Sequence, residues 1–127
     1  MLDNATVIKE YSHMTFDMYI QFKRLLILSP RDFVCAGAFI KFKDGTYVFP
    51  TYSVEREDKP EVKKFIRANL YCGGWVLRAI DETKTLAYYY NRADMKGSVP
   101  GWVLKQGASM QALLIHKLRE YMKKQIK

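Results

Sequence analysis

The sequence predicts an α+β domain in which a curved antiparallel β-sheet grips one long C-terminal α-helix. Two observations predict this order. Short apolar stretches separated by turn signals fill the first hundred residues, and from about Pro100 the apolar residues recur with a helical period. A helix with a wide apolar stripe needs a sheet face to cover, and the space between them is either a core or a cavity. Without repeats or Gly/Ser linkers, residues 1–127 are expected to form a single domain.

Apolar and alternating runs predict the strands. The run 16–28 suits a strand or a short buried helix, and we favour the strand. Asp44-Gly45 is a strong hairpin signal, while the charged stretch 54–64, which contains Pro60, predicts a solvated loop. Cys72-Gly73-Gly74 separates two apolar runs. The expected strands are residues 6–14, 16–28, 32–43, 46–53, 65–71, 75–80 and 85–92.

The C-terminal segment is expected to be a basic amphipathic helix. Pro100 suits its first turn, and Lys123 and Lys124 suit the negative end of the helix dipole. Residues 99–127 hold six basic residues and one acidic residue, a net charge of +5 out of the +8 of the chain. The predicted apolar face comprises Leu104, Ala108, Ile115, Leu118 and Met122, flanked by Leu114 and Tyr121.

Composition limits the class of function. A net charge of +8 and a pI of about 9.5 favour an anionic partner, either nucleic acid or a membrane surface. No apolar run approaches the roughly 20 residues of a membrane span. Cys35 and Cys72 are expected to be buried free thiols in a reducing cytoplasm. Catalytic, metal-binding and cofactor motifs are not found, and His13 and His116 lack a helpful context, so we expect no enzyme, metal or cofactor.

Five motifs occur in an order and at spacings that resemble the C-terminal part of a START domain. They are SPRDFV, KDGTYV, SVEREDKPEVKKFIRA, GGWVL and DMKGSVPGWVL, and the likeness covers residues 29–124. START domains carry lipids, and in them a curved sheet and a long C-terminal helix enclose an apolar tunnel. The resemblance implies that the chain binds one lipid, a phospholipid, sterol or sphingolipid, and presents it at membranes from a cytoplasmic location. It also implies that residues 54–63 correspond to a mobile loop beside the tunnel mouth.

The resemblance and strand alternation together predict the contacts. Asn69 and Tyr71 share a face that the family turns inward, where either could bond a headgroup or be an ordinary satisfied polar residue. Trp102 is expected either at the membrane interface or in the core. The predicted lipid-binding residues are Cys35, Gly37, Phe39, Asn69, Tyr71, Leu104, Ala108, Ile115 and Leu118, and the predicted membrane contacts are Trp102, Lys117, Lys123 and Lys124.

Two departures from the family pattern affect these expectations. Full START domains are more than half as long again, so the N-terminal part of the fold is missing here. The chain is therefore either a truncated product or a sheet whose exposed edges pair with a second chain, and a homodimer is one expectation. Gly37 also stands where many members have an arginine that anchors the ligand, so recognition by a buried arginine is not carried over.

Alternatives remain open for several residues. A nucleic-acid-binding module would use the basic helix with Tyr88, Tyr89 and Tyr90 as stacking rings, and this partner ranks below lipid. A partner-binding domain without a tunnel is a third possibility. Arg31 and Asp32 are expected to form an ion pair at the strand start or to stabilise a turn, and Arg67 to pair with the acidic loop.

Overall fold

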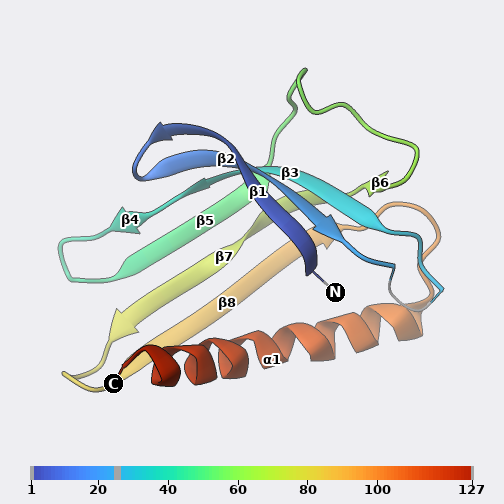
Figure 1. Cartoon of the computed structure of the whole chain (residues 1–127). Helices are drawn as coiled ribbons and strands as arrows, with labels where there is room; N and C mark the ends of the chain where they lie inside the picture. Colours follow the sequence, from blue (N-terminus) through green and yellow to red (C-terminus); the bar gives the residue numbers. More distant parts are fainter. Residues whose placement is uncertain (1, 25–26, 127) are drawn as a thin grey trace. The chain divides into compact units, whose positions relative to one another are not determined.

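The computed structural model describes residues 2–24 and 27–126. The chain divides into two compact units, Met1–Gly97 and Ser98–Lys127. The first unit is a β-sheet and the second contains one helix (Figure 1). The expected succession of a sheet followed by a helix is confirmed.

One strongly twisted sheet makes up the first unit (Figure 1). Its central path runs β1-β2-β3-β5-β7-β8, with β4 beside β5 and β6 beside β3. All pairs are antiparallel except the two-residue pair of β3 with β6, which is parallel. The strands are β1 Leu2–Ser12, β2 Thr15–Phe22, β3 Arg31–Ala38, β4 Ile40–Lys41, β5 Tyr47–Ser53, β6 Ile66–Arg67, β7 Asn69–Ala79 and β8 Thr85–Asp94.

The first half of the sheet follows the predicted pattern with shifted ends. Within the run 16–28, the strand ends at Phe22, and residues 25–26 of that run lie outside the described residues. Phe39 interrupts the expected strand 32–43, which therefore becomes β3 and β4. The hairpin at Asp44-Gly45 is confirmed: Gly45 has a φ of 85°, and the Asp44 carboxylate accepts the Thr46 N–H at 2.9 Å.

The double glycine lies inside a strand, which corrects the expectation of a break at residues 72–74. β7 passes through Gly73 and Gly74 without ending. Gly74 has a φ of 137°, and a Cβ there would lie 1.9 Å from the Phe49 carbonyl oxygen. Glycine serves both turns and close backbone approaches, so the pattern of two apolar runs around a double glycine does not distinguish a break from one continuous strand.

Helix α1, Gly101–Gln125, forms the second unit. Pro100 precedes it, and the Pro100 carbonyl accepts the N–H groups of Val103 at 3.0 Å and Leu104 at 3.2 Å. Lys123 and Lys124 occupy the last turn, as expected for the negative end of the dipole. Among the described helices, none is long and apolar enough to cross a membrane.

Candidate functional site

The strand register assigns the side chains of the sheet to two faces. Directly opposed residues share a face, and successive residues alternate. Phe16, Gly37, Thr51, Gly73 and Asn91 form one continuous row across β2, β3, β5, β7 and β8. We call the side that carries this row the apolar face, and the opposite side, which carries Asp17 and Asp32, the ionic face.

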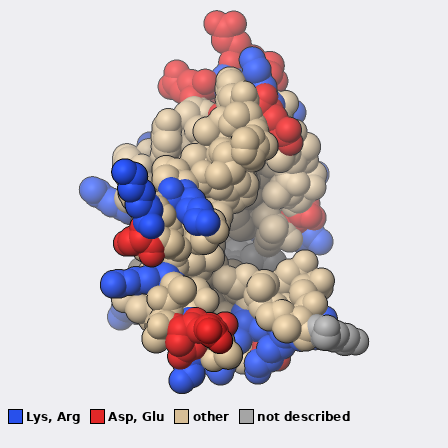
Figure 2. Space-filling view, turned by 90° about the vertical axis from the view of Figure 1, so that its left-hand side faces the viewer, with Lys and Arg blue, Asp and Glu red and all other residues tan. Residues whose placement is uncertain are grey.

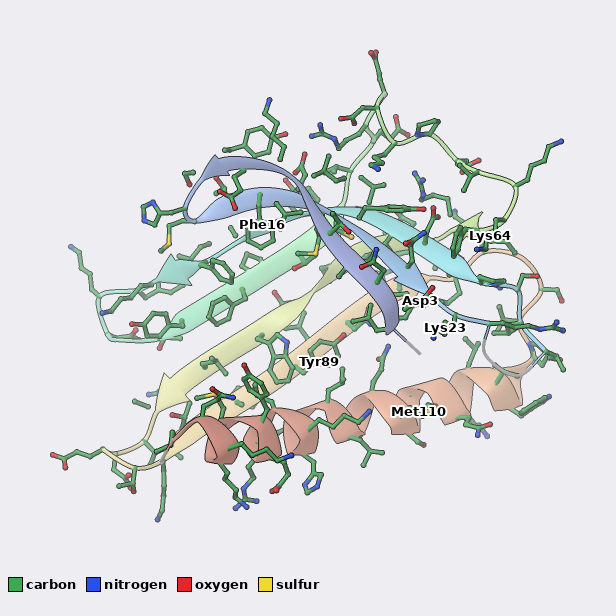
Figure 3. The ribbon with its side chains drawn as sticks, in the orientation of Figure 1. Asp3, Phe16, Lys23, Lys64, Tyr89 and Met110 are labelled. Carbon is green, nitrogen blue, oxygen red and sulfur yellow. The ribbon has the colours of Figure 1, made fainter. Side chains whose placement is uncertain are left out.

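Uncharged residues occupy the middle of the apolar face. Phe33, Cys35 and Ala68 are buried, and Met18, Ile20, Phe22, Leu70 and Met95 pack against them. Farther along, the Phe39 ring lies 5.3 Å from the Phe16 ring and 4.9 Å from the Phe49 ring, centroid to centroid. Trp75 and Tyr89 add a ring pair at 5.0 Å. Phe16 of β2 and Tyr89 of β8, at distant positions in the strand order, are labelled in Figure 3.

Three of the predicted lipid contacts lie on this face. Cys35 is fully buried, and this burial raises the pKa of its thiol to about 11, so it is an inert packing group. A Cβ on Gly37 would lie 3.1 Å from Cε2 of Phe16, so the Phe16 ring occupies the space beside this glycine. Phe39, still 40% exposed, lies just beyond the end of β3. Their role in lipid binding stays a prediction.

The register corrects the inward face expected for Asn69 and Tyr71. Tyr71 is the extra residue of a bulge, because Leu70 pairs with Ala93 and Cys72 pairs with Arg92. Leu70 contacts the apolar core, whereas the exposed Tyr71 ring lies 5.3 Å from the Arg92 guanidinium. Asn69 and Tyr71 therefore lie on the ionic face. A bulge reverses strand alternation, and the sequence gives no signal for it other than the adjacent glycines.

In helix α1 the shielded stripe differs from the predicted one. Of the five residues of the predicted apolar face, Leu104, Ala108, Ile115 and Met122 are exposed, and only Leu118 is partly shielded. Adjacent apolar stripes on this helix are one residue apart in sequence, so periodicity alone does not choose between them. The less exposed positions of the apolar stripe are Val103, Gly107, Met110, Leu114 and Leu118.

The predicted membrane-contact residues are accessible. Trp102 is 55% exposed, so the core-packing alternative does not describe it. Lys117, Lys123 and Lys124 are exposed as well, and Lys123 pairs with Glu120 at 2.9 Å. Their contact with a membrane stays a prediction.

The ionic face contains a buried pair that the sequence analysis did not identify. Asp32 is fully buried and accepts bonds from Arg67 Nε at 2.8 Å and from the Tyr19 hydroxyl at 2.7 Å. Burial and the bond to Asp32 raise the pKa of Tyr19. Arg67 was expected to pair with acidic loop residues, but it donates instead to the carbonyl oxygens of Lys59 and Pro60, at 3.1 Å each.

A second charged cluster attaches the start of the charged loop, residues 54–64, to the sheet. Arg56 Nη1 lies 2.6 Å from Asp17 Oδ2, which also accepts the Tyr11 hydroxyl at 2.7 Å. Arg56 Nε contacts Asp58 at 2.8 Å. The loop projects beyond the strands in Figure 1, and acidic side chains gather at this end of the molecule in Figure 2. The sequence signal for each cluster is an aspartate within an apolar strand, Asp17 in one and Asp32 in the other. The arginine that pairs with each aspartate is distant in sequence and is not identifiable from a local pattern.

Arg31 stabilises the turn that ends the sheet unit, which bears out one of its two expected roles. Its Nε and Nη2 donate to the carbonyl oxygens of Met95 and Lys96, at 3.0 Å each. Burial lowers the pKa of this guanidinium. Arg31 is thus committed to backbone acceptors, and Asp32 pairs with Arg67 instead of Arg31.

Two open cavities lie beside the charged loop. One, of about 480 Å³, is lined by Tyr11, Asp17, Tyr52 and Arg56 among others, and the second, of about 860 Å³, by Val34, Arg56, Arg67 and Asn69 among others. Among their charged side chains, Asp17, Arg56 and Arg67 are engaged in the pairs described above. Both cavities are lined by apolar as well as charged side chains, and the lining of the first includes Phe16 and Gly37.

The exposed cysteine, the three consecutive tyrosines and the metal-binding side chains complete the description of the site. Cys72 is exposed, which corrects its expected burial, and it is a free thiol like Cys35. Tyr88 is 54% exposed, while Tyr89 and Tyr90 are half-buried, so one of the three rings is freely presented for stacking. Across residues 2–24 and 27–126, the structure places no group of three or more His, Cys, Asp and Glu side chains suitable for a metal ion.

Comparisons with known proteins identify the architecture. The START domain family model matches residues 1–125. None of the curated proteins matches the chain. The structure of human StAR-related lipid transfer protein 5 matches with a TM-score of 0.76 and 21% identity over 83% of this chain and 51% of that chain. Human STARD10 matches with a TM-score of 0.79 and 21% identity, over 96% and 49% of the two chains.

A bacterial structure extends the likeness. The STAR-related lipid transfer protein of Xanthomonas axonopodis matches with a TM-score of 0.60 and 19% identity, over 84% of this chain and 59% of that chain. At these identities the likeness establishes the fold, an α+β helix-grip arrangement of sheet and C-terminal helix. The chain spans about half the length of the solved structures that it matches.

Proposed function

Because this chain belongs to the START domain family, we propose that it binds a single lipid molecule against the apolar face of its sheet. START domains are lipid-binding and lipid-transfer modules, so the proposal is binding and carriage instead of catalysis. In this proposal the two compact units are parts of one partial START domain. The observation that carries the proposal is the uncharged row across five strands.

The row is suited to an apolar ligand. Two of its five members, Gly37 and Gly73, have no side chain. The nearest side chains to these glycines are Phe16 for Gly37 and Leu70 for Gly73, at 3.1 Å and 3.2 Å from the Cβ positions. Removing apolar surface from water stabilises a complex by roughly 0.8 kcal/mol for each buried CH₂ group. Chain or ring burial should therefore dominate affinity, with hydroxyl and amide groups such as those of Thr51 and Asn91 orienting the polar end.

We further propose that the basic helix brings the protein to anionic membranes. Lys117, Lys123 and Lys124 are exposed and Trp102 offers an accessible ring. Each well-placed basic residue contributes about 1 kcal/mol near an anionic leaflet. Co-sedimentation with phosphatidylserine vesicles should be lost on raising the salt concentration, and equal sedimentation with purely zwitterionic vesicles would contradict the electrostatic part.

Native mass spectrometry of freshly purified protein tests the lipid proposal. We expect one discrete lipid mass per chain, and fragmentation of the adduct identifies the cargo. The same protein stripped of lipid and incubated with mixed neutral and phospholipid vesicles should regain one adduct. A chain that stays lipid-free in both experiments would overturn the proposal.

A further inference from the structure

The middle of the charged loop, residues 54–64, is firmly bonded to the sheet at Lys59. The Lys59 carbonyl oxygen accepts a bond from Arg67 at 3.1 Å, and the Lys59 ammonium group lies 5.1 Å from the centroid of the Tyr19 ring. Both partners also bind Asp32, which is fully buried. Moving Lys59 would break bonds of a network whose central carboxylate is shielded from water, and such bonds are costly to lose. This point of the loop is therefore fixed.

Arg56 attaches the loop in a way that is easier to release. Its Nη1 donates to Asp17 of β2 at 2.6 Å and to the Tyr11 hydroxyl at 3.1 Å. Its Nε and Nη2 donate to the two carboxylate oxygens of Asp58, at 2.8 Å each. Because Asp58 belongs to the same loop, Arg56 keeps this bidentate partner when it leaves Asp17. Asp17 in turn lines the cavity of about 480 Å³, where water can reach it.

Residues 54–56 lie between two cavities. They line both the cavity of about 480 Å³ and the cavity of about 860 Å³. The Val54 N–H donates to the Val34 carbonyl of β3 at 3.0 Å, so the segment is bonded to the sheet where it begins. Lys59 fixes the segment where it ends. Residues 55–58, between these two points, can move without breaking either attachment, and their movement would join the cavities.

We propose that residues 55–58 form a hinged partition, which swings about Val54 and Lys59 when Arg56 leaves Asp17. In the closed position the partition divides the space beside the loop into two cavities. In the open position it joins them into one groove. The bond between Arg56 and Asp17 is the latch that sets the population of the two positions.

The partition is a shorter moving element than the sequence predicts. The resemblance to START domains implies one mobile loop over residues 54–63, whereas Lys59 and Pro60 stay bonded to Arg67 here. Movement is thus confined to the residues before Lys59. The partition does not require bound lipid, so a negative result would leave the lipid proposal untouched.

Distances between paired spin labels, measured by pulsed electron paramagnetic resonance, test the partition. In a Cys72→Ser background, a reference label at Thr85 is combined with a label at Glu57, inside the partition, or at Glu61, beyond its fixed end. Both glutamates are exposed, so each position accepts a label. Cys35 is fully buried and should remain unlabelled.

Asp17→Asn weakens the attachment of Arg56 without changing the sequence of the loop. In the protein labelled at Glu57 it should raise the population of a second distance about tenfold, as expected for the loss of a hydrogen bond between charged groups. In the protein labelled at Glu61 it should leave the distance unchanged. Equal changes in the two proteins, or no change in either, would overturn the partition.

A milder variant decides the question if Asp17→Asn fails to fold. Tyr11→Phe removes only the hydroxyl that bonds both Asp17 and Arg56, and it should shift the distances from Glu57 in the same direction. Tyr52→Phe is the matched control, because Tyr52 is 54% exposed and lines the same cavity. No effect of Tyr11→Phe, or an equal effect of both variants, would overturn the proposal.

Discussion

The two faces of the sheet differ in what their side chains contact. On the ionic face Asp17 and Asp32 are almost completely buried, and each accepts an arginine and a tyrosine hydroxyl. On the apolar face several rings, including Phe39, remain partly exposed and contact one another. The buried carboxylates of the ionic face thus have their partners within the sheet unit, while the rings of the apolar face retain surface that a ligand can cover. Stability should depend more on the first and lipid binding more on the second.

The largest expected effect follows from removing the charge of Asp32. Asp32→Asn keeps the shape of the side chain but leaves Arg67, whose side chain is 17% exposed, without its counter-charge. Breaking a buried pair by removing one partner costs about 3–5 kcal/mol, and this should appear as a lower free energy of unfolding in urea. Asp58→Asn is the matched control, because that carboxylate is 57% exposed and its loss should change stability little. Equal effects of the two variants would contradict the assigned difference in burial.

A smaller effect on stability, but a larger effect on lipid, is expected from Gly37→Arg. The Phe16 ring lies at 3.1–3.2 Å from the Cβ position, so the side chain must displace it. Overpacking of this kind costs about 1–3 kcal/mol. A charge in the uncharged row should also weaken lipid binding by about tenfold, equivalent to roughly 1.4 kcal/mol.

Gly45→Arg serves as a control, because a Cβ there meets nothing within 4 Å and the residue belongs to an exposed turn. Because Gly45 has a φ of 85°, an arginine there also lowers stability. The two variants are therefore compared by their lipid stoichiometry. Unchanged lipid binding by Gly37→Arg in native mass spectra would show that Gly37 does not face the lipid.

The difference between the faces also explains what the sequence could predict. Strand and helix identity followed from periodicity and turn residues, as at Asp44-Gly45, because these signals are local. The pair of Asp32 with Arg67 spans thirty-five positions, and no local pattern selects one partner among many charges. The face of Tyr71 depended on a bulge whose only trace was the neighbouring glycines. Local rules therefore predicted the elements, whereas long-range pairing and bulges decided the site.

The smallest expected effect concerns alkaline pH and the Tyr19 hydroxyl. Burial and the bond to Asp32 raise the pKa of Tyr19 above its ordinary value of 10.0. A raised pKa in the folded state means that its stabilising contribution is complete below pH 10.0 and is lost as pH rises through the folded-state pKa. Tyr19→Phe should cost about 1 kcal/mol at neutral pH through the lost hydrogen bond, and should flatten the decline above pH 10.0.

Urea unfolding at neutral pH and at stepped alkaline pH measures both parts of this prediction. Tyr88→Phe is the control, because Tyr88 is 54% exposed and its hydroxyl should contribute little. Other tyrosines and lysines also titrate in this range, so the difference between each variant and the parent is the informative quantity. If Tyr19→Phe and Tyr88→Phe change the alkaline slope equally, the Tyr19 hydroxyl is not part of a closed network. The ionic face would then be as open to solvent as the rim of the apolar face.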